Sequence, residues 1–358
     1  HSSFRRMTRY EFNYALQDLL GLPHDFAKDL PPEAQSEDGF QNSSELLHMS
    51  VSQLETYRRL ARKALKRAIV HGKRPAVLNW GVTMQDAGRI DWAKQNEQFE
   101  KAKAAAAGDP ERRKQRLSEL EAQFRQPHSV PYYRNLTTGR TVRATWAYQR
   151  AKFANQPTES PREIPAALDH VAILPRGRNQ RFTIELGNRL PDEGIMRVRV
   201  RASRANADDA SIPSLQLLFG WQATNEGRAV FPVPSAERAI TARPEKPGFY
   251  QWDVPLDELY PRNSVRKTSP MGAMPNPSEY IRLVNCSVSQ GPIQIDYVEV
   301  AAPIYDDWPP ASHKRIFIVS ENRSDEQEYA REVLATFMQR AWRRPISDDD
   351  IERKLRLF

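Results

Sequence analysis

The stretch Met196-Arg-Val-Arg-Val-Arg-Ala202 decides the fold class of this chain. Apolar residues alternate with arginines at every second position, which is the period of a β-strand with one buried and one exposed face. The same register places Arg197, Arg199 and Arg201 together on the opposite face from the apolar residues. We expect this arginine face to be exposed to solvent or to meet an acidic partner.

Six further segments have strand-like patterns and are separated by turn residues. They lie at 181–186, 214–219, 229–233, 248–254, 281–284 and 293–300. Several short strands joined by proline- and glycine-rich turns are typical of a β-sandwich or jelly roll, because each strand has one face to bury. We therefore predict a central antiparallel, jelly-roll-like β-sandwich over residues 136–304.

Helical patterns precede this region. Thr8 with Glu11, and Ser50 with Gln53, have the spacing of capping boxes, and apolar residues follow each pair at helical intervals. Residues 91–125 are rich in Ala, Lys, Glu, Gln and Arg, which predicts one or two exposed helices. These helices form either an arm packed on a neighbour or a solvated hairpin, and we favour the hairpin.

Helical spacing returns after residue 305. A last helix begins at Ser347, and its apolar side contains Ile351, Leu355 and Phe358. A short helix is marginal alone in water, because most of its stability comes from packing the apolar face. We therefore expect residues 325–358 to pack on another chain or on further polypeptide.

Together these patterns predict a multidomain α+β chain with an N-terminal helical segment, a central sandwich and the start of a C-terminal helical domain. The expected parts are a helical domain at 1–72, a helical linker or arm at 73–135, the sandwich at 136–304 and the second helical region at 305–358.

Composition and charge argue against several functions. The 358 residues carry a net charge of +8, but the arginines are spread along the chain. A basic chain without a basic cluster gives little support for nucleic-acid binding or for a polyanion surface. The single cysteine, Cys286, excludes a disulfide within the chain and haem attachment through Cys-x-x-Cys-His, and its apolar surroundings predict burial. No segment is apolar for long enough to span a membrane.

The sequence contains no recognisable catalytic motif. It lacks Gly-x-Ser-x-Gly, a P-loop and a dinucleotide fingerprint, and no two histidines have zinc-ligand spacing. A glycosidase stays open, because its two carboxylates come from distant positions. We predict no catalytic residue and favour a non-enzymatic role for this segment.

Aromatic side chains are the candidates for carbohydrate binding, because a flat ring covers the apolar face of a pyranose. The candidates are Trp221, Tyr250 and Trp252. Tyr250 and Trp252 share one strand face with Val254, so core packing is the preferred interpretation for these two. Trp221 lies at a strand end and has the best prospect of exposure.

Several stretches resemble a known family. The segment Arg5-Arg-Met-Thr-Arg-Tyr-Glu-Phe-Asn-Tyr-Ala-Leu-Gln-Asp-Leu-Leu-Gly21, with the later Gly39-Phe40-x-Asn42, resembles a planctomycete-specific domain of unknown function. Phe337-Met-Gln-Arg-Ala-Trp-Arg-Arg-Pro345 resembles the start of a second domain of the same proteins. Between the two, such proteins often carry a sandwich similar to carbohydrate-binding modules, and residues 194–202 and 295–303 resemble its early and last strands.

The resemblance implies a large exported protein, periplasmic or at the cell surface, often with haem in an upstream cytochrome c-like domain. One hypothesis is a non-catalytic binding or scaffold region whose sandwich contacts a polysaccharide or a partner domain. The alternative is a structural part of a cytochrome c-linked periplasmic redox enzyme whose reactive domains lie elsewhere. In sandwich modules of this type a final-strand aspartate often serves a structural calcium, which makes Asp296 the candidate metal ligand; no other cofactor is expected in this chain.

Overall fold

The computed structural model describes residues 6–22, 24–28, 30–34, 47–105, 108–146, 151, 153–165, 168–176, 180–206, 212–233, 235, 237–286 and 291–357. The chain divides into two compact units, one formed by Pro75–Ile304 and the other by His1–Arg74 together with Tyr305–Phe358. The predicted α+β fold class is confirmed, with helices towards both ends of the chain and two antiparallel sheets between them. The motif Gly39-Phe40-x-Asn42 lies outside the described residues.

The larger sheet of the sandwich has seven antiparallel strands in the order β10-β6-β12-β4-β2-β3, with β1 paired to β12. They are β1 (Leu78–Thr83), β2 (Tyr132–Asn135), β3 (Thr141–Arg143), β4 (His170–Leu174), β6 (Ile195–Arg204), β10 (Gly248–Pro255) and β12 (Ile293–Ile304). The long β12 pairs with β4 through residues 293–295 and with β1 through residues 297–302. One strand thus joins two neighbours along the same edge.

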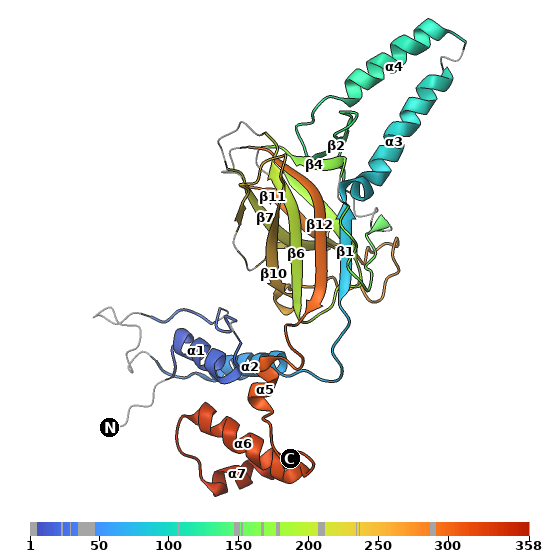
Figure 1. Cartoon of the computed structure of the whole chain (residues 1–358). Helices are drawn as coiled ribbons and strands as arrows, with labels where there is room; N and C mark the ends of the chain where they lie inside the picture. The colour runs from blue at the N-terminus through green and yellow to red at the C-terminus, as the bar shows by residue number, and fades with distance from the viewer. Residues whose placement is uncertain are drawn as a thin grey trace. The chain divides into compact units, whose positions relative to one another are not determined.

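The smaller sheet has five strands in the order β5-β11-β7-β8, with β9 paired to β7. They are β5 (Arg181–Gly187), β7 (Ser214–Gln222), β8 (Arg228–Pro232), β9 (Arg238–Ala239) and β11 (Glu279–Asn285). Figure 1 shows β6, β10 and β12 in the front layer and β7 and β11 behind them. Alternate side chains of both sheets, such as Val198, Phe219 and Ile281, meet between the layers in one hydrophobic core.

The predicted strands are confirmed to within a few residues of their expected bounds. The predicted register of β6 is also confirmed, because Met196, Val198 and Val200 are buried in the core. The range 73–135, predicted as a helical linker or arm, also contains β1 and β2, which belong to the larger sheet. Both strands are short and lie beside helix-rich sequence. The alternation of Leu78, Trp80 and Val82 is therefore only weak evidence for a strand.

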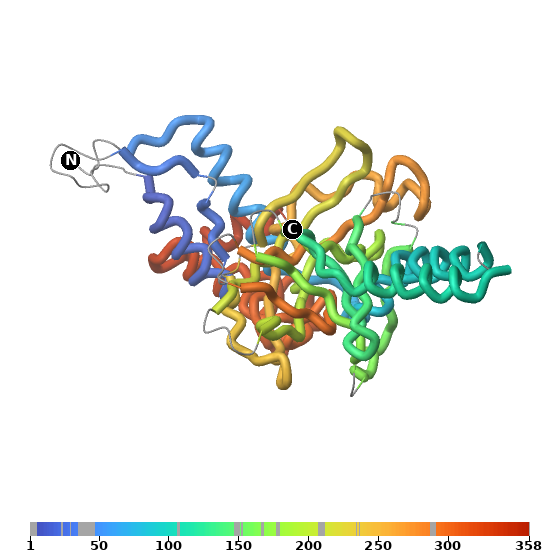
Figure 2. The backbone as a smooth tube through the Cα atoms, turned by 90° about the horizontal axis from the view of Figure 1, so that it is seen from above, coloured from blue at the N-terminus to red at the C-terminus, as the bar shows by residue number. Residues whose placement is uncertain are grey.

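Between β1 and β2 the chain forms a helical hairpin of α3 (Met84–Ala105) and α4 (Pro110–Phe124). The hairpin projects from the sandwich in two views (Figures 1 and 2). One or two exposed helices were predicted for this range; the structure has two, and the Asp109 side chain caps the second. Packing of this arm on a neighbour stays a prediction.

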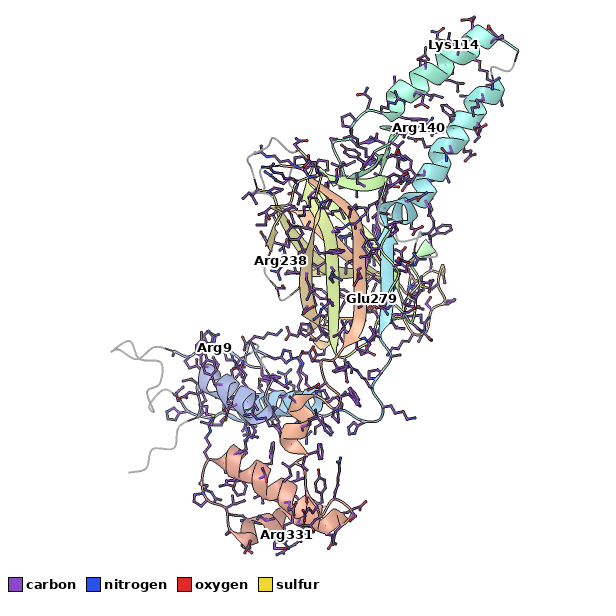
Figure 3. The ribbon with its side chains drawn as sticks, viewed as in Figure 1. Arg9, Lys114, Arg140, Arg238, Glu279 and Arg331 are labelled. Atoms are coloured by element: carbon purple, nitrogen blue, oxygen red, sulfur yellow. The ribbon has the colours of Figure 1, made fainter. Side chains whose placement is uncertain are left out.

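The base of the hairpin is fixed to the sandwich by Arg140, in the turn between β2 and β3. Its guanidinium bonds to the carboxylate of Glu121 on α4 and lies 4.7 Å from the ring centroid of Phe99 on α3. Figure 3 shows Arg140 at the base of the hairpin and Lys114 near the tip.

The second unit consists of helices: α1 (Arg9–Leu20), α2 (Val51–Ala68), α5 (Ala311–Ile316), α6 (Glu326–Trp342) and α7 (Asp348–Leu355). The capping boxes predicted at Thr8 and Ser50 are present, and Ser347 begins α7 with a third. Gly21 ends α1 with a φ of 67°, a left-handed conformation that glycine adopts without strain.

A small hydrophobic cluster holds this unit together. It includes Leu16 and Leu20 of α1 and Ile316 of α5, and Val333 and Phe337 of α6 pack against it. Part of the apolar face of α6 is therefore covered by the same chain, a contact that the sequence analysis did not predict. Packing of the C-terminal helices on a further partner stays a prediction, and the end of their expected apolar side, residue 358, is not described. None of the described helices is long and apolar enough to cross a membrane.

Candidate functional site

The three aromatic residues predicted to bind carbohydrate lie on inward-facing strand positions. Trp252 is fully buried in the core, so we correct its prediction: a sugar cannot reach this ring. Tyr250 is half-buried on the same strand face, and its hydroxyl accepts hydrogen bonds from two backbone N–H groups at 3.0 Å. Trp221 follows Phe219 by two positions in β7, and its Nε1 donates to the carbonyl oxygen of Pro261 at 2.8 Å. Trp221 and Tyr250 are both half-buried, and each uses its polar atom in hydrogen bonds within the protein.

The predicted calcium ligand Asp296 has an arginine as its partner. It lies at a bulge where the register of β12 against β6 shifts between Ile295 and Tyr297. Its carboxylate accepts a hydrogen bond from Nε of Arg201 at 2.8 Å. Burial raises the pKa of this carboxyl, and the bond to Arg201 opposes that rise. Within the described part of the chain, no three His, Cys, Asp or Glu side chains are grouped so that they could hold a metal ion.

The outer face of the larger sheet carries Arg197, Arg199 and Arg201, which we call the arginine ladder. Their partners are Asp253 on β10, Glu299 on β12 and Asp296 on β12, at N–O distances of 2.8, 3.3 and 2.8 Å respectively. Arg199 also lies over the exposed ring of Phe249, 4.4 Å from its centroid. The ladder faces outward as predicted, and neighbouring strands of the same sheet supply its acidic partners.

The outer face of the smaller sheet has fewer acidic groups. Its cross-strand register places Glu185, Tyr280, Gly220 and Val230 in one row, and Thr183, Arg282, Leu218 and Pro232 in the next. The residues that alternate with them, such as Ile184, Ile281 and Phe219, lie in the core. The two rows therefore face away from the core.

Trp146, which follows β3, lies against the first of these rows. Its indole Nε1 donates to Oε1 of Glu185 at 2.7 Å. Its ring meets the ring of Tyr280 edge-on, with centroids 5.3 Å apart. The Tyr280 ring in turn lies against Gly220, because a Cβ added there would be 2.8 Å from Cε2 of Tyr280. Glycine thus makes room for an aromatic ring on the outer side of the sheet, where Tyr280 itself is only 1% exposed.

Arg282 packs against both rings. Its guanidinium carbon lies 4.7 Å from the ring centroid of Tyr280 and 5.2 Å from that of Trp146, within cation–π range. Its Nε donates to Oγ1 of Thr183 at 3.1 Å. Burial lowers the pKa of Arg282, and the like charges of Arg181 and Arg228 act in the same direction. We call Trp146, Glu185, Tyr280 and Arg282 the Arg282 site.

Glu185 is the acidic member of the Arg282 site and has only 9% of its surface exposed. Oε1 accepts from Trp146, and Oε2 accepts from the hydroxyl of the fully buried Ser278 at 2.5 Å. Burial raises the pKa of Glu185 to about 7, although both hydrogen bonds and the charge of Arg282 favour the ionised form. A carboxyl group whose pKa is raised this far, beside a specific charged partner, marks a candidate functional site.

The sequence analysis missed this site, although it placed the strands that carry it. Arg282 interrupts an apolar run that ends at Cys286, and a buried arginine at that position was the available signal. Trp146 lies outside every predicted strand, and 39 residues separate it from Glu185. Burial of Cys286 was predicted and is confirmed, and this burial raises the pKa of its thiol to about 11.

Residues 5–70 match a family described as "PSD3: Protein of unknown function (DUF1587)". This match covers the segment that resembles the planctomycete-type domain and leaves the sandwich unassigned. No curated protein matches the chain.

Among solved structures, two with carbohydrate-binding modules and one adhesin domain align with part of this chain. The CBM22-1 xylan-binding domain of Paenibacillus barcinonensis Xyn10C aligns at 10% identity with a TM-score of 0.26, over 38% of this chain and 75% of that chain. The CBM22-1-GH10 modules of Clostridium thermocellum Xyn10B, complexed with xylohexaose, align at 10% identity with a TM-score of 0.25, over 38% of this chain and 23% of that one. An adhesin domain of Lys-gingipain from Porphyromonas gingivalis aligns at 16% identity with a TM-score of 0.22, over 37% and 73%.

Proposed function

We propose that the sandwich is a non-catalytic glycan-binding module of an exported multidomain protein, and that its ligand binds at the Arg282 site. The observation that carries the proposal is the packing of Arg282 against Trp146 and Tyr280 on an outward-facing row of the smaller sheet. Sugar recognition needs a ring that covers an apolar sugar face and polar groups that fix its hydroxyls. The half-buried Trp146 and the guanidinium of Arg282 supply these two elements side by side.

The rows beyond the Arg282 site offer room for a chain of sugars. Val230 is 39% exposed, and Leu218 and Pro232 continue the second row on β7 and β8. These apolar positions extend the surface across the sheet from Tyr280. A polysaccharide that lies across the strands would contact Trp146 at one end and Val230 at the other.

A binding role fits the carboxylates of this face better than a hydrolytic role. A glycosidase needs two carboxyl groups on either side of the scissile bond. On the outer strand positions of the described part of this sheet, Glu185 is the one carboxylate. Both of its oxygens also accept hydrogen bonds from the protein.

Affinity of the whole chain for a panel of neutral and acidic polysaccharides tests the proposal. We expect Trp146→Ala to weaken binding by about fivefold or more, since stacking of one aromatic ring is worth about 1 kcal/mol or more. Phe249→Ala is the matched control, because it removes an exposed ring from the other sheet. Trp146→Phe keeps a ring and should retain part of the affinity. Absence of binding to every member of the panel, or equal losses in Trp146→Ala and Phe249→Ala, would refute the proposal.

The redox alternative stays a prediction of the resemblance. It requires haem in another part of the polypeptide, which spectroscopy of the full-length gene product would detect. Export to the periplasm or the cell surface is likewise part of the proposal, and fractionation of the producing cells tests it.

A further inference from the structure

We infer that the glycan bound on this face is anionic, carrying carboxylate or sulfate groups, and that Arg282 is the residue that recognises the anion. The inference rests on the proposed function and specifies its ligand class. The net charge of the chain is not the basis, because the ladder on the other sheet neutralises its own arginines. The basis is one buried guanidinium and its surroundings.

The first step is the unpaired state of Arg282. The side chain belongs to a residue that is only 8% exposed, and its Nε bonds to Thr183. Among the described residues, its two Nη atoms have no hydrogen-bond acceptor and no carboxylate within ion-pair distance. They are not among the fully buried polar atoms that lack a partner, so they still reach solvent at the surface of the sheet. A nearly buried arginine with open terminal donors is costly to the fold unless a partner binds it.

The second step is that Glu185 does not fill this role. It is the nearest acidic group on the face, but Trp146 and Ser278 occupy its two oxygens. No ion pair between Glu185 and Arg282 is present among the described residues. The two charges act on each other through a longer-range coulombic interaction. The guanidinium therefore keeps its donors for a ligand.

The third step is the sign of the field around Arg282. Arg181 on β5 and Arg228 on β8 are exposed, and both act on Arg282 with like charge. Arg181, Arg228 and Arg282 thus share the described outer strand positions of this sheet with one carboxylate, that of Glu185. Both like charges act against the charged form of Arg282, and an anion bound to its guanidinium would offset them.

The fourth step is geometric. When the plane of a guanidinium packs against aromatic rings, its Nη edge points away from them and presents two parallel N–H donors. These two donors match two oxygens of a carboxylate or a sulfate. A neutral hydroxyl offers a single, uncharged oxygen and cannot form the same bidentate pair. The ring of Trp146 beside it provides contact for the sugar that carries the anion. An acidic sugar satisfies both parts of the site, and a free small anion satisfies one.

Two matched pairs of polysaccharides distinguish the effect of ligand charge from that of the sugar backbone. Polygalacturonate is compared with its fully methyl-esterified form, and dextran sulfate with dextran, using the whole chain at low salt and at about 0.15 M salt. We expect the charged member of at least one pair to bind about tenfold or more tightly than its neutral partner, because a bidentate charged hydrogen bond replaces a neutral one. The preferred pair identifies the anion as carboxylate or sulfate.

Arg282→Gln should abolish this preference, and Arg282→Lys, which keeps the charge without the planar fork, should lose most of it. Arg199→Gln is the matched control, since it removes one positive charge and one arginine–ring contact from the other face. We expect this control to keep the preference of the unmodified chain. The comparison of each acid with its neutral partner on the unmodified chain needs no variant, so it decides the question even where a variant does not fold.

Three outcomes would overturn the inference. Equal binding of both members of each pair would remove the anion preference and leave a glycan-binding module intact. Equal loss in Arg199→Gln and Arg282→Gln would assign the preference to net charge. Tighter binding of single-stranded DNA than of either acidic polysaccharide would replace the ligand class. Failure to bind any of the four polysaccharides would instead refute the proposed function itself.

Discussion

The two outer faces of the sandwich use arginine in opposite ways. On the larger sheet each arginine of the ladder meets a carboxylate from a neighbouring strand. On the smaller sheet Arg282 packs against Trp146 and Tyr280, and the carboxylate beside it is hydrogen-bonded elsewhere. The first face is neutralised within the fold, and the second keeps a guanidinium available for a ligand.

This difference shows that exposure alone does not locate a binding site. The ladder is the more exposed of the two, and its arginines attract attention in the sequence through their alternation. Cross-strand pairs of opposite charge stabilise a sheet modestly and leave little charge for a partner. The Arg282 site is more buried, and its charges are less well matched. A site of that kind costs stability, so the comparison can be tested by measuring stability on both faces.

The largest effect should come from Glu185. Burial raises the pKa of Glu185 in the folded chain to about 7, above the ordinary value of 4.5 for a glutamate. The folded state therefore holds the proton more tightly, and the stability associated with this group is fully present at low pH and is lost as the pH rises towards and beyond 7. Glu185→Gln has no such dependence, so its stability relative to the parent chain should rise by about 3 kcal/mol between pH 4 and pH 8.

Urea unfolding of both chains across this pH range measures the difference. The glutamine can still accept from Trp146, while its amide can donate to the hydroxyl oxygen of Ser278, so the local packing is kept. A constant difference between the two chains from pH 4 to pH 8 would show that the carboxyl group of Glu185 is not a strained member of the site.

The next largest effect on stability should come from replacing a glycine, and one glycine from each sheet is compared. A Cβ at Gly220 would lie 2.6 Å from the carbonyl oxygen of Ala229 and 2.8 Å from the ring of Tyr280, so backbone and ring must both shift. A Cβ at Gly248 in β10 would meet its nearest atom at 3.4 Å, an ordinary contact. We expect Gly220→Ala to cost about 2 kcal/mol, the middle of the range for overpacking, and Gly248→Ala to change stability by less than about 0.5 kcal/mol.

Thermal or urea unfolding gives both values. Gly220→Ala should also weaken polysaccharide binding, because Arg282 packs on the ring that is displaced. Equal costs for the two glycines would mean that the Tyr280 ring is free to move, which would remove the rigid support assumed for Arg282.

Much of the fold follows from sequence periodicity. The alternation in β6 predicted both a strand and the identity of its buried face, and the capping boxes predicted where the first helices begin. The short strands β1 and β2 gave little signal because each has only a few alternating positions. Packing of α6 on α1 was not predictable either, since it joins residues that are more than 300 positions apart.

The candidate site was less predictable than the fold because its members depend on register. Glu185 and Tyr280 are directly opposed because β11 and β5 pair in one particular register, which ends at a bulge between Glu279 and Tyr280. The aromatic candidates chosen from the sequence were judged by residue type and strand position. Their alternation with core residues correctly favoured burial for Trp252, and the accessible ring, Trp146, came from a segment without strand character.

The smallest effect should come from the ladder, and its pH dependence should have the opposite sign to that of Glu185. Nε and one Nη of Arg197 donate to the two oxygens of Asp253 at 2.8 and 2.9 Å, and this pairing lowers the pKa of the Asp253 carboxyl. The stabilisation by this pair is therefore present above 3.8, the ordinary pKa of an aspartate, and is lost as the pH falls below it. Both side chains are about one-third or more exposed, so solvent screens the pair, and we expect Arg197→Gln to cost less than about 1 kcal/mol at neutral pH. That cost should shrink further in high salt, and also as the pH falls below 3.8 and Asp253 becomes protonated. NMR titration of Asp253 in the two chains checks the cause, since its pKa should return towards the ordinary range in the variant. A loss of several kcal/mol in Arg197→Gln would mean that the ladder is not a screened surface feature, and the contrast between the two faces would then fail.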